Sequence, residues 1–363
     1  MCPNPDESSD AWDERYRSLF PLYEAFAEKL RLLLRDVLET KGLAIVQTEA
    51  RAKEVESFAG KIARKGNDYK DPLTEVTDLA GVRIITYYLE DSALVGELLR
   101  AEFDVDEQQS VLKGSELAPD RFGYVSDHYI VRLKAPRSEL SEWSPFLGLV
   151  AEIQVRTATQ HAWAAIEHRL GYKTRDLLPK DVRRRLYRLS ALFELADEQF
   201  SGARAVAEER LEEYASNLRG GNLNVPIDLS SLQAYLDESK RVGELAEVAV
   251  SVNAPLRVIP FSTEPDRQER DRSDLINTLA RHDIKSLADF DALLASPDAP
   301  TMLRDYVSAY KAFRNKSKGP SWFIEDMLNI LVFLLLPDPS KEEISAIYGV
   351  GLCEPLFEVL DAK

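Results

Sequence analysis

The sequence has few of the residues that build disulfide frameworks and metal clusters. Among 363 residues there are only two cysteines and four histidines. Cys2 and Cys353 lie near opposite ends of the chain, so they form neither a metal-binding nor a redox spacing. The sequence therefore gives no indication of a disulfide-stabilised secreted domain or of a cysteine-based metal site.

Long apolar stretches are also missing. A transmembrane helix needs a run of about 18 or more apolar residues, and the longest candidate, Met327–Leu336, is shorter and fits a buried core helix. The N-terminal segment "MCPNPDESSD" is polar and acidic, unlike a signal peptide. We therefore expect a cytoplasmic protein with no membrane-spanning segment.

Positive charge is scarce relative to negative charge. The chain has 46 Lys and Arg against 62 Asp and Glu, which gives a formal net charge of −16. Such a chain repels phosphate on average, which argues against a general nucleic-acid binder. A polyanionic substrate must therefore be held by a local basic cluster, so the positions of such clusters are informative.

The periodicity of apolar residues divides the chain into two regions. The first region, residues 1–218, alternates helices and strands, which predicts an α/β fold with about five strands. The expected helices are 13–40, 52–65, 91–101 and 158–219, the last broken near Pro179, and the expected strands are 43–50, 81–89, 103–110, 126–134 and 147–157. The segment "RGGNLNVPIDLS" at 219–230 predicts a domain boundary, and residues 225–363 predict a mostly helical domain.

The segment "RAKEVESFAGKIARKG" is the first of four patches with chemical potential. In a helix, Lys53, Ser57 and Lys61 would share one face, with Arg51 at its entrance. Two cations and a hydroxyl near a helix N-terminus are suited to holding phosphate. The alternative is a solvated charged face, because Glu54 lies in the same segment.

The second patch is "DLAGVRI", in which Asp78 precedes a predicted buried strand that contains Arg83. A carboxylate at a strand edge is suited to Mg²⁺, which prefers hard oxygen ligands. The alternative is an aspartate that caps a turn and pairs with an arginine.

The third patch, "RFGYVSDHYIV", places Tyr124 after a glycine at a strand entrance, where its ring can stack on a base. His128 follows Ser126 on one face of the predicted strand. The alternative makes Tyr124 a packing aromatic and His128 a hydrogen-bonded polar residue.

The fourth patch, "AEIQVRTATQHAWAAIEHRLGYK", begins as a strand and continues as a helix. Glu152, Gln154 and Arg156 point to one side of the strand, whereas Ile153 and Val155 point to the other. A carboxylate, an amide and a guanidinium on one sheet face predict the floor of an active site. A solvated edge strand is the alternative.

Together the four motifs, in this order over residues 43–173, resemble the RelA/SpoT alarmone synthetase domain. The resemblance implies a nucleotidyltransferase-like fold around a mixed five-stranded sheet flanked by helices. It also implies an enzyme that transfers pyrophosphate from ATP to the 3′-hydroxyl of GDP or GTP, forming (p)ppGpp and AMP with Mg²⁺ as cofactor.

The resemblance further implies roles for individual residues. Asp78 and Glu152 would bind Mg²⁺, with Arg83 beside them as a third catalytic residue, and Glu152 could instead activate the 3′-hydroxyl. Residues for ATP phosphates would be Arg51, Lys53, Ser57 and Lys61, and residues for the acceptor would be Tyr124, His128, Gln154 and Arg156. His161 and His168 match the motif but are expected to be structural.

One departure from the family pattern leaves other functions open. The segment "LKGSELAPDRFGY" has few basic residues where synthetases that act on guanine nucleotides are basic. A related toxin branch pyrophosphorylates the 3′ end of tRNA, and the run Lys180, Arg183, Arg184, Arg185 and Arg188 could receive an RNA backbone. The alternative for this run is pairing with acids such as Asp181 and Glu194. A non-catalytic nucleotide-binding regulator is the third reading.

The region 225–363 carries the apolar segment "WFIEDMLNILVFLLL", which must be buried in its own domain or against another surface. We expect a short, synthetase-only enzyme in which this region regulates or neutralises the first domain. The sequence is compatible with a homo-oligomer but predicts no particular oligomeric state.

Overall fold

The computed structural model describes residues 9–65, 69–111, 126–169, 179–252, 265–314 and 322–363. The chain forms two compact units, Met1–Ala203 and Arg204–Lys363. The first contains all the β-strands of the described ranges, and the second is helical.

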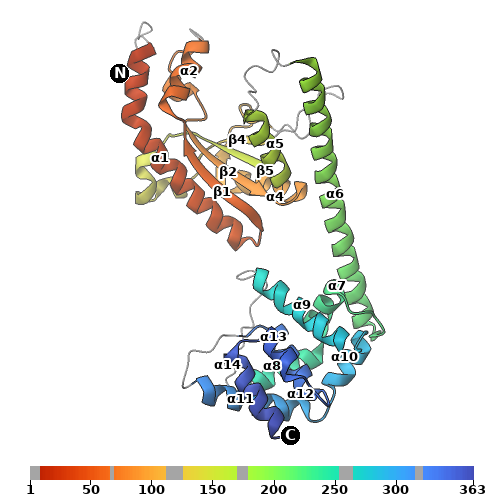
Figure 1. The fold of residues 1–363 in the computed structure, drawn as a ribbon. Coiled ribbons are helices and arrows are strands. Elements are labelled where there is room, and N and C mark those ends of the chain that lie inside the picture. The colour runs from red at the N-terminus through yellow and green to blue at the C-terminus, as the bar shows by residue number, and fades with distance from the viewer. Residues whose placement is uncertain (1–8, 66–68, 112–125, 170–178, 253–264, 315–321) are drawn as a thin grey trace. The chain divides into compact units, whose positions relative to one another are not determined.

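A single mixed sheet organises the first unit (Figure 1). Its strand order is β1-β2-β5-β4-β3, in which β2 and β5 are parallel and every other neighbouring pair is antiparallel. The strands are β1 (Ile45–Ala52), β2 (Ala80–Thr86), β3 (Phe103–Val105), β4 (Asp127–Leu133) and β5 (Ala151–Thr157). The predicted α/β fold with a mixed five-stranded sheet is confirmed.

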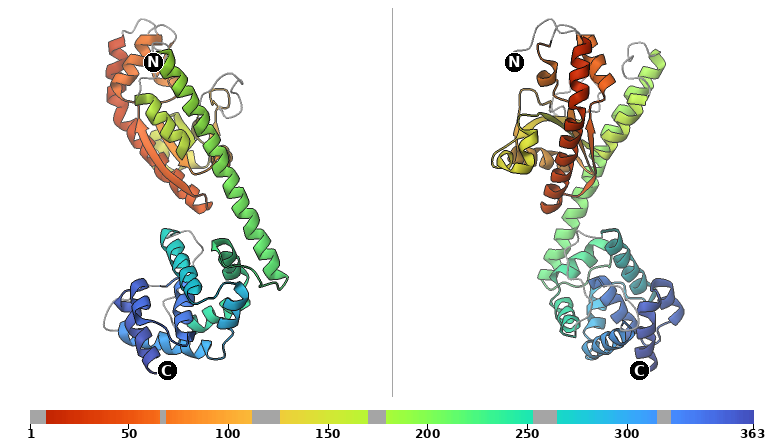
Figure 2. Two further views of the ribbon diagram at one scale, coloured as in Figure 1. Left: turned by 45° about the vertical axis from the view of Figure 1, so that its right-hand side comes forward. Right: turned by 90° about the vertical axis from the view of Figure 1, so that its left-hand side faces the viewer.

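Helices flank this sheet. The long α1 (Ser9–Thr40) packs across β1 and β2, as Figure 2 shows from two sides. The others in this unit are α2 (Val55–Lys65), α3 (Pro72–Glu75), α4 (Leu89–Glu102), α5 (Ala158–Arg169) and the first part of α6 (Lys180–Arg219), with short 3₁₀ turns at Arg137–Glu139 and Ser141–Phe146.

The two faces of the sheet differ in polarity. On one face, Ile84, Ile153 and Val155 are buried in a core that also contains Phe26 and Leu30 of α1. Because side chains alternate along a strand, the residues between them on β5 lie on the opposite face. That face is polar.

The boundary between the units lies within α6, at Ala203 and Arg204, not at the Gly-Gly segment where the sequence suggests it. Gly220 and Gly221 do end the helix, and Gly221 has a φ of +79°. Before the boundary, Asp197 of α6 bonds to Thr157 of β5, with 2.6 Å between Oδ2 and Oγ1. The glycines therefore mark the end of α6, whereas the change from the first compact unit to the second occurs earlier, within the helix.

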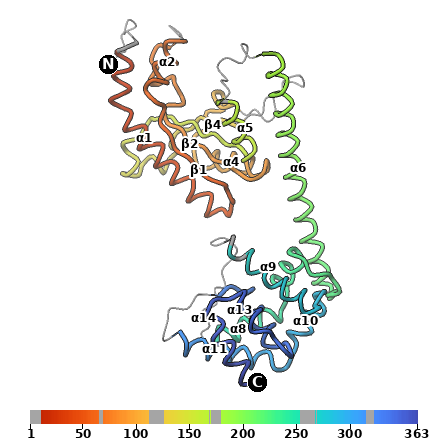
Figure 3. Tube along the Cα trace, viewed as in Figure 1, coloured from red at the N-terminus to blue at the C-terminus, as the bar shows by residue number. Residues whose placement is uncertain are grey.

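The second unit is a helical bundle around α12 (Ile324–Leu335), whose residues Met327–Leu334 are almost completely buried. The burial predicted for this apolar segment is confirmed. Around it lie α7 (Leu229–Glu238), α8 (Lys240–Ser251), α9 (Pro265–Arg281), α10 (Leu287–Leu294), α11 (Ala299–Arg314), α13 (Lys341–Ile347) and α14 (Val350–Asp361), which can be followed along the trace in Figure 3. A strand suggested by "APLRVIPF" lies outside the described residues. Within the described ranges, no helix has the length and apolarity needed to cross a membrane.

A buried acidic pair interrupts the apolar interior of this unit. Asp326 of α12 is 5% exposed and faces Asp271 of α9. Burial raises the pKa of both carboxyl groups, and the negative charge of Asp326 adds to the rise at Asp271. Arg267 lies near both, at 3.7 Å from Asp271 Oδ2 and 3.6 Å from Asp326 Oδ2, and opposes the rise. The folded unit therefore retains protons that the unfolded chain has released.

This pair predicts that the second unit becomes less stable as the pH rises from about 5 to 8, because the folded state then loses protons that the unfolded state has already lost. Asp271→Asn should reduce that dependence, because only Asp326 of the pair then titrates, so the variant should lose less stability between pH 5 and pH 8 than the wild type. Urea unfolding followed by circular dichroism at both pH values measures the difference. The exposed Glu244→Gln is the control, and an equal effect of both variants at both pH values would contradict the assignment.

Candidate active site

The polar face of the sheet brings together residues from four strands. In the register, Gly81 of β2 pairs with Glu152 of β5, and Arg83 pairs with Gln154. Residues paired directly across strands lie on the same face. On the same basis β1 contributes Glu49 and Arg51, and β4 contributes His128, which pairs with Gln154.

Asp78 lies in the turn before β2 and accepts hydrogen bonds from two lysines. The Lys53 Nζ is 2.6 Å from Oδ2, and the Lys61 Nζ is 2.9 Å from Oδ1. Lys53 follows β1 and precedes α2, which begins at Val55. The prediction that Lys53 shares a helical face with Ser57 and Lys61 is therefore wrong for Lys53. Lys53 and Lys61 nevertheless both bond to Asp78, whereas Ser57 on α2 is exposed.

The two lysines set the charge state of Asp78. Its burial alone would raise the pKa of the carboxyl group, but hydrogen bonds and charges from Lys53 and Lys61 outweigh burial and lower the pKa. Tyr16 of α1 supports this arrangement because its hydroxyl donates to the Lys53 carbonyl at 2.6 Å. Asp78 is therefore an ionised carboxylate near neutral pH.

Glu152 is 9% exposed and begins a line of hydrogen bonds along the strand. Its Oε1 contacts His128 Nδ1 and accepts from Gln154 Nε2 at 3.1 Å. The Gln154 Oε1 accepts from Arg156 Nη2 at 2.5 Å, and His128 Nε2 lies 2.8 Å from the Ser126 hydroxyl. Burial would raise the pKa of Glu152, but the bonds from His128 and Gln154 lower it, so this carboxylate is also ionised.

Three guanidinium groups form a local basic cluster, as expected for a negatively charged protein that binds a polyanionic substrate. Arg51, Arg83 and Arg156 share the polar face, and Arg83 Nη1 bonds to Glu49 Oε2 at 2.6 Å. Burial lowers the pKa of Arg156 to about 10, and the positive charge of Arg83 adds to this. Among the described residues, the buried Nε atoms of Arg83 and Arg156 have no hydrogen-bond partner. A bound anion or polar ligand would satisfy them.

Three residues contribute to this site that the sequence interpretation left out or placed outside it. Glu49 follows the alternation of β1 and shares the parity of Arg51, which could have identified it. Burial lowers the pKa of His161 on α5, and the charges of Glu49, Arg83 and Arg156 all act on it, so its ring lies within the electrostatic reach of the site. Tyr16 gave no local sequence signal because its contact with Lys53 spans 37 residues.

A small cavity of about 50 Å³ lies between these side chains. It is lined by Glu49, Ala50, Arg51, Asp78, Gly81, Val82, Arg83, Glu152 and Gln154. Gly81 lies between Arg51 and Glu152, and a Cβ at this position would make only ordinary van der Waals contacts with their backbone oxygens, at 3.6 and 3.7 Å. Asp78 and Glu152, predicted to act together, therefore line one space.

The structure does not describe every predicted site residue. Tyr124, predicted to stack on the acceptor base, lies outside the described residues, as do the glycine before it and the segment from residue 112 to 125. His168 lies on α5, and its side chain is not described. These assignments stay predictions.

The polar face of the sheet and the segments beside it thus bring two ionised carboxylates, Asp78 and Glu152, together with two lysines and three arginines. Comparison with known proteins shows that residues 50–176 match the model of the region found in RelA and SpoT proteins. The chain is 29% identical over 219 residues to the GTP pyrophosphokinase YjbM of Bacillus subtilis, covering 57% of this chain and 97% of the relative. It is 30% identical over 160 residues to the GTP pyrophosphokinase YwaC of the same organism, covering 44% and 73%.

A crystal structure of the small alarmone synthetase 1 from Bacillus subtilis superposes with a TM-score of 0.45 and 29% identity, covering 54% of this chain and 99% of that one. The chain belongs to the RelA/SpoT family and is an enzyme of the pyrophosphokinase class. The family match ends before the second unit begins.

The contact between His128 and Glu152 yields a prediction about pH dependence. His128→Ala removes a hydrogen bond that lowers the Glu152 pKa, whereas the burial that raises it remains, so the pKa should rise. The acidic limb of the pH–rate profile should move to higher pH, since Glu152 is protonated earlier as pH falls. Ser126→Ala keeps the His128 contact and should leave that limb unchanged. If both variants shift the limb equally, the contact does not set the charge of Glu152.

Proposed function

We propose that this enzyme transfers pyrophosphate from ATP to the 3′-hydroxyl of a guanine nucleotide, GDP or GTP, and releases AMP. The observation that supports this most directly is that Asp78 and Glu152 line one cavity beside Arg51 and Arg83. Two relatives named GTP pyrophosphokinases give the acceptor class.

The donor set fits Mg²⁺ bound together with a nucleotide. Mg²⁺ is usually held by one or two protein carboxylates plus substrate phosphates and water. Asp78 and Glu152 supply two carboxylates, and hydrogen bonds offset the burial of both, from Lys53 and Lys61 at Asp78 and from His128 and Gln154 at Glu152. Bound there, Mg²⁺ would neutralise charge on the transferred phosphates.

The basic residues would hold the triphosphate of ATP. Lys53 and Lys61 already lie 2.6 and 2.9 Å from Asp78, so they can turn to phosphate oxygens when the nucleotide binds. Arg51 and Ser57 would complete the phosphate contacts. Gln154 and Arg156 orient Glu152 through their hydrogen bonds and line the acceptor side.

The reaction follows from this placement. The acceptor 3′-oxygen attacks the β-phosphorus of ATP, forming an O–P bond. The bond between the β-phosphorus and the oxygen shared with the α-phosphate breaks, and AMP leaves with that oxygen. Glu152, in contact with His128, would receive the proton of the 3′-hydroxyl if Asp78 alone supplied the protein carboxylate to Mg²⁺. Positioning and charge stabilisation account for most of the catalysis in such a displacement.

A second acceptor, the 3′ end of tRNA, is favoured by one observation. Arg184, Arg185 and Arg188 of α6 are exposed, and among the described residues they form no ion pair with Asp181 or Glu194. A row of exposed arginines suits an RNA backbone. In that case the second unit would restrain a toxin.

One experiment separates the acceptors. The full chain is incubated with ATP labelled in the β- and γ-phosphates, Mg²⁺ and either GDP, GTP or bulk tRNA. Label on GDP or GTP is the expected result. Label on tRNA alone establishes the second candidate, and label on none of them, with AMP absent, identifies a non-catalytic regulator.

The paired carboxylates yield the first functional prediction. Asp78→Asn and Glu152→Gln should each lower kcat by at least about a hundredfold, because the charge that organises the transferred phosphates is lost. Asp104→Asn, exposed on β3, is the matched control and should keep activity. Circular dichroism verifies the fold, and an active Asp78→Asn protein would contradict the assignment.

The proposed stacking of Tyr124 on the acceptor base yields a second functional prediction. Tyr124→Ala should raise the KM for the acceptor much more than the KM for ATP, because stacking on a base contributes about 1–3 kcal/mol. Steady-state kinetics with each substrate varied in turn gives both values. Equal increases in the two KM values would indicate that Tyr124 has a packing role.

A further inference from the structure

One face of α6, within the first unit, is apolar, exposed and edged by arginine. Leu189, Leu192 and Leu195 are 43%, 60% and 50% exposed, although helices usually turn such residues inward. Arg188 and Arg185 lie on the same side, four and seven residues before Leu192, because residues three, four and seven apart share a helix face. Neither arginine forms an ion pair within the described ranges, so this face is both apolar and positively charged. It is called the α6 face below.

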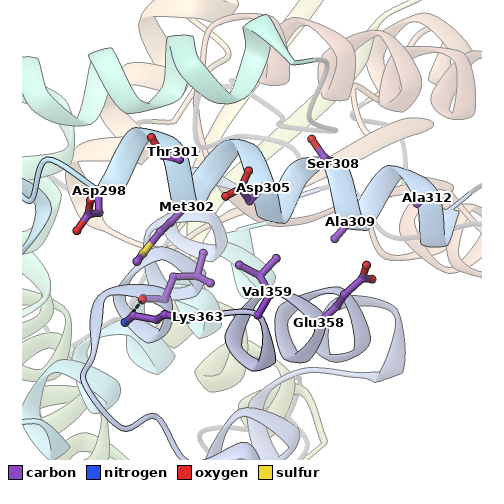
Figure 4. Close-up of a pocket in the computed structure, with 12 residues that line it drawn as sticks. Asp298, Thr301, Met302, Asp305, Ser308, Ala309, Ala312, Glu358, Val359 and Lys363 are labelled. Atoms are coloured by element: carbon purple, nitrogen blue, oxygen red, sulfur yellow. Dashed lines mark hydrogen bonds between the residues drawn. The ribbon is translucent and has the colours of Figure 1, made fainter.

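The second unit contains a groove of opposite charge. Its volume is about 550 Å³, and it lies between α11 and α14. Met302, Ala309 and Val359 form its apolar floor, and Asp298, Asp305 and Glu358 stand around it, as Figure 4 shows. It is called the α11–α14 groove below.

The carboxylates of this groove are not neutralised by the part of the chain that the structure describes. No ion pair involving Asp298, Asp305 or Glu358 occurs among these residues. Lys363 lines the groove, but its Nζ donates to the carbonyl oxygens of Leu334 and Leu336 at 3.1 and 3.2 Å. A cationic partner would therefore meet unpaired negative charge.

The dimensions of the groove suit a helix. Asp298 lies in the turn that immediately precedes α11 and Asp305 lies on α11, seven residues further along, a spacing of about 10 Å along a helix axis. The small side chains of Ala309, Ala312 and Ala362 line the groove and permit close approach of another backbone. An amphipathic helix that lays its apolar face into a groove is a recurrent mode of recognition.

We propose that the α11–α14 groove of one molecule binds the α6 face of a second copy of this chain. Leu189, Leu192 and Leu195 would cover the apolar floor, and Arg185 and Arg188 would face the carboxylates. Both surfaces occur on every chain, and association would remove from water the exposed leucines of the α6 face and the half-buried floor of the groove. The contact joins two different patches, so it is heterologous and can extend from copy to copy or close into a ring. This association does not depend on the proposed function.

A complementation experiment tests it with the full chain. Leu192→Glu disables the α6 face, and the double variant Asp305→Arg/Glu358→Arg disables the groove. All three positions are exposed, so the substitutions should leave the fold intact, which circular dichroism verifies. Tyr187→Glu, five residues from Leu192 and roughly 140° around the helix, is the control for α6. Glu354→Arg, exposed on α14 and absent from the groove lining, is the control for the groove.

Sedimentation velocity at several concentrations provides the readout. The wild type and both controls should form species larger than a monomer, and each disabled variant alone should be monomeric. An equimolar mixture of the two disabled variants should form a dimer and nothing larger, because it retains one intact pair of surfaces. A mixture that stays monomeric overturns the proposal, as does a monomeric wild type. Loss of tRNA binding in Arg185→Glu/Arg188→Glu, with self-association retained, would assign the arginines to RNA instead.

Discussion

The alternation of side chains along β5 is the constraint on which the site depends. Ile153 and Val155 are held in the core by α1, so Glu152, Gln154 and Arg156 must lie on the other face. Their hydrogen bonds run along the strand, from Arg156 to Gln154 to Glu152, and cross to His128 on β4. A shift of one residue in register would bury the polar set and expose the apolar one. The packing of the core therefore fixes the geometry of the site.

The second constraint is electrostatic. Asp78 and Glu152 are largely buried, yet both have pKa values below normal because each is surrounded by hydrogen-bond donors. Ionised carboxylates in such a setting stay ionised only while their partners remain in place. The lysines at Asp78 come from two segments, one after β1 and one on α2, which Tyr16 and α1 hold beside the sheet. A protein with a net charge of −16 thus gathers arginines and lysines at the site proposed to bind phosphate.

Local patterns in the sequence predicted most of the first unit. The β-branched runs gave the strands, and the alternation at 152–156 gave the polar face. Sequence spacing failed where the chain leaves a regular element: Lys53 was assigned to a helix that begins only at Val55. It also failed for contacts over long separations, such as that of Tyr16 with Lys53, because no local pattern records them. The Gly-Gly pair marked the end of α6 correctly. The boundary between the two compact units lies earlier, within α6, because residues before it, such as Asp197, contact the first unit at Thr157.

Product analysis of the full-length enzyme tests the central claim most directly. Phosphorus NMR of a reaction containing ATP, Mg²⁺ and GDP or GTP distinguishes transfer of two phosphates from transfer of one. Attack at the β-phosphorus predicts AMP in a one-to-one ratio with an acceptor that carries a new diphosphate. Accumulation of ADP with a monophosphorylated acceptor would show attack at the γ-phosphorus and contradict the account.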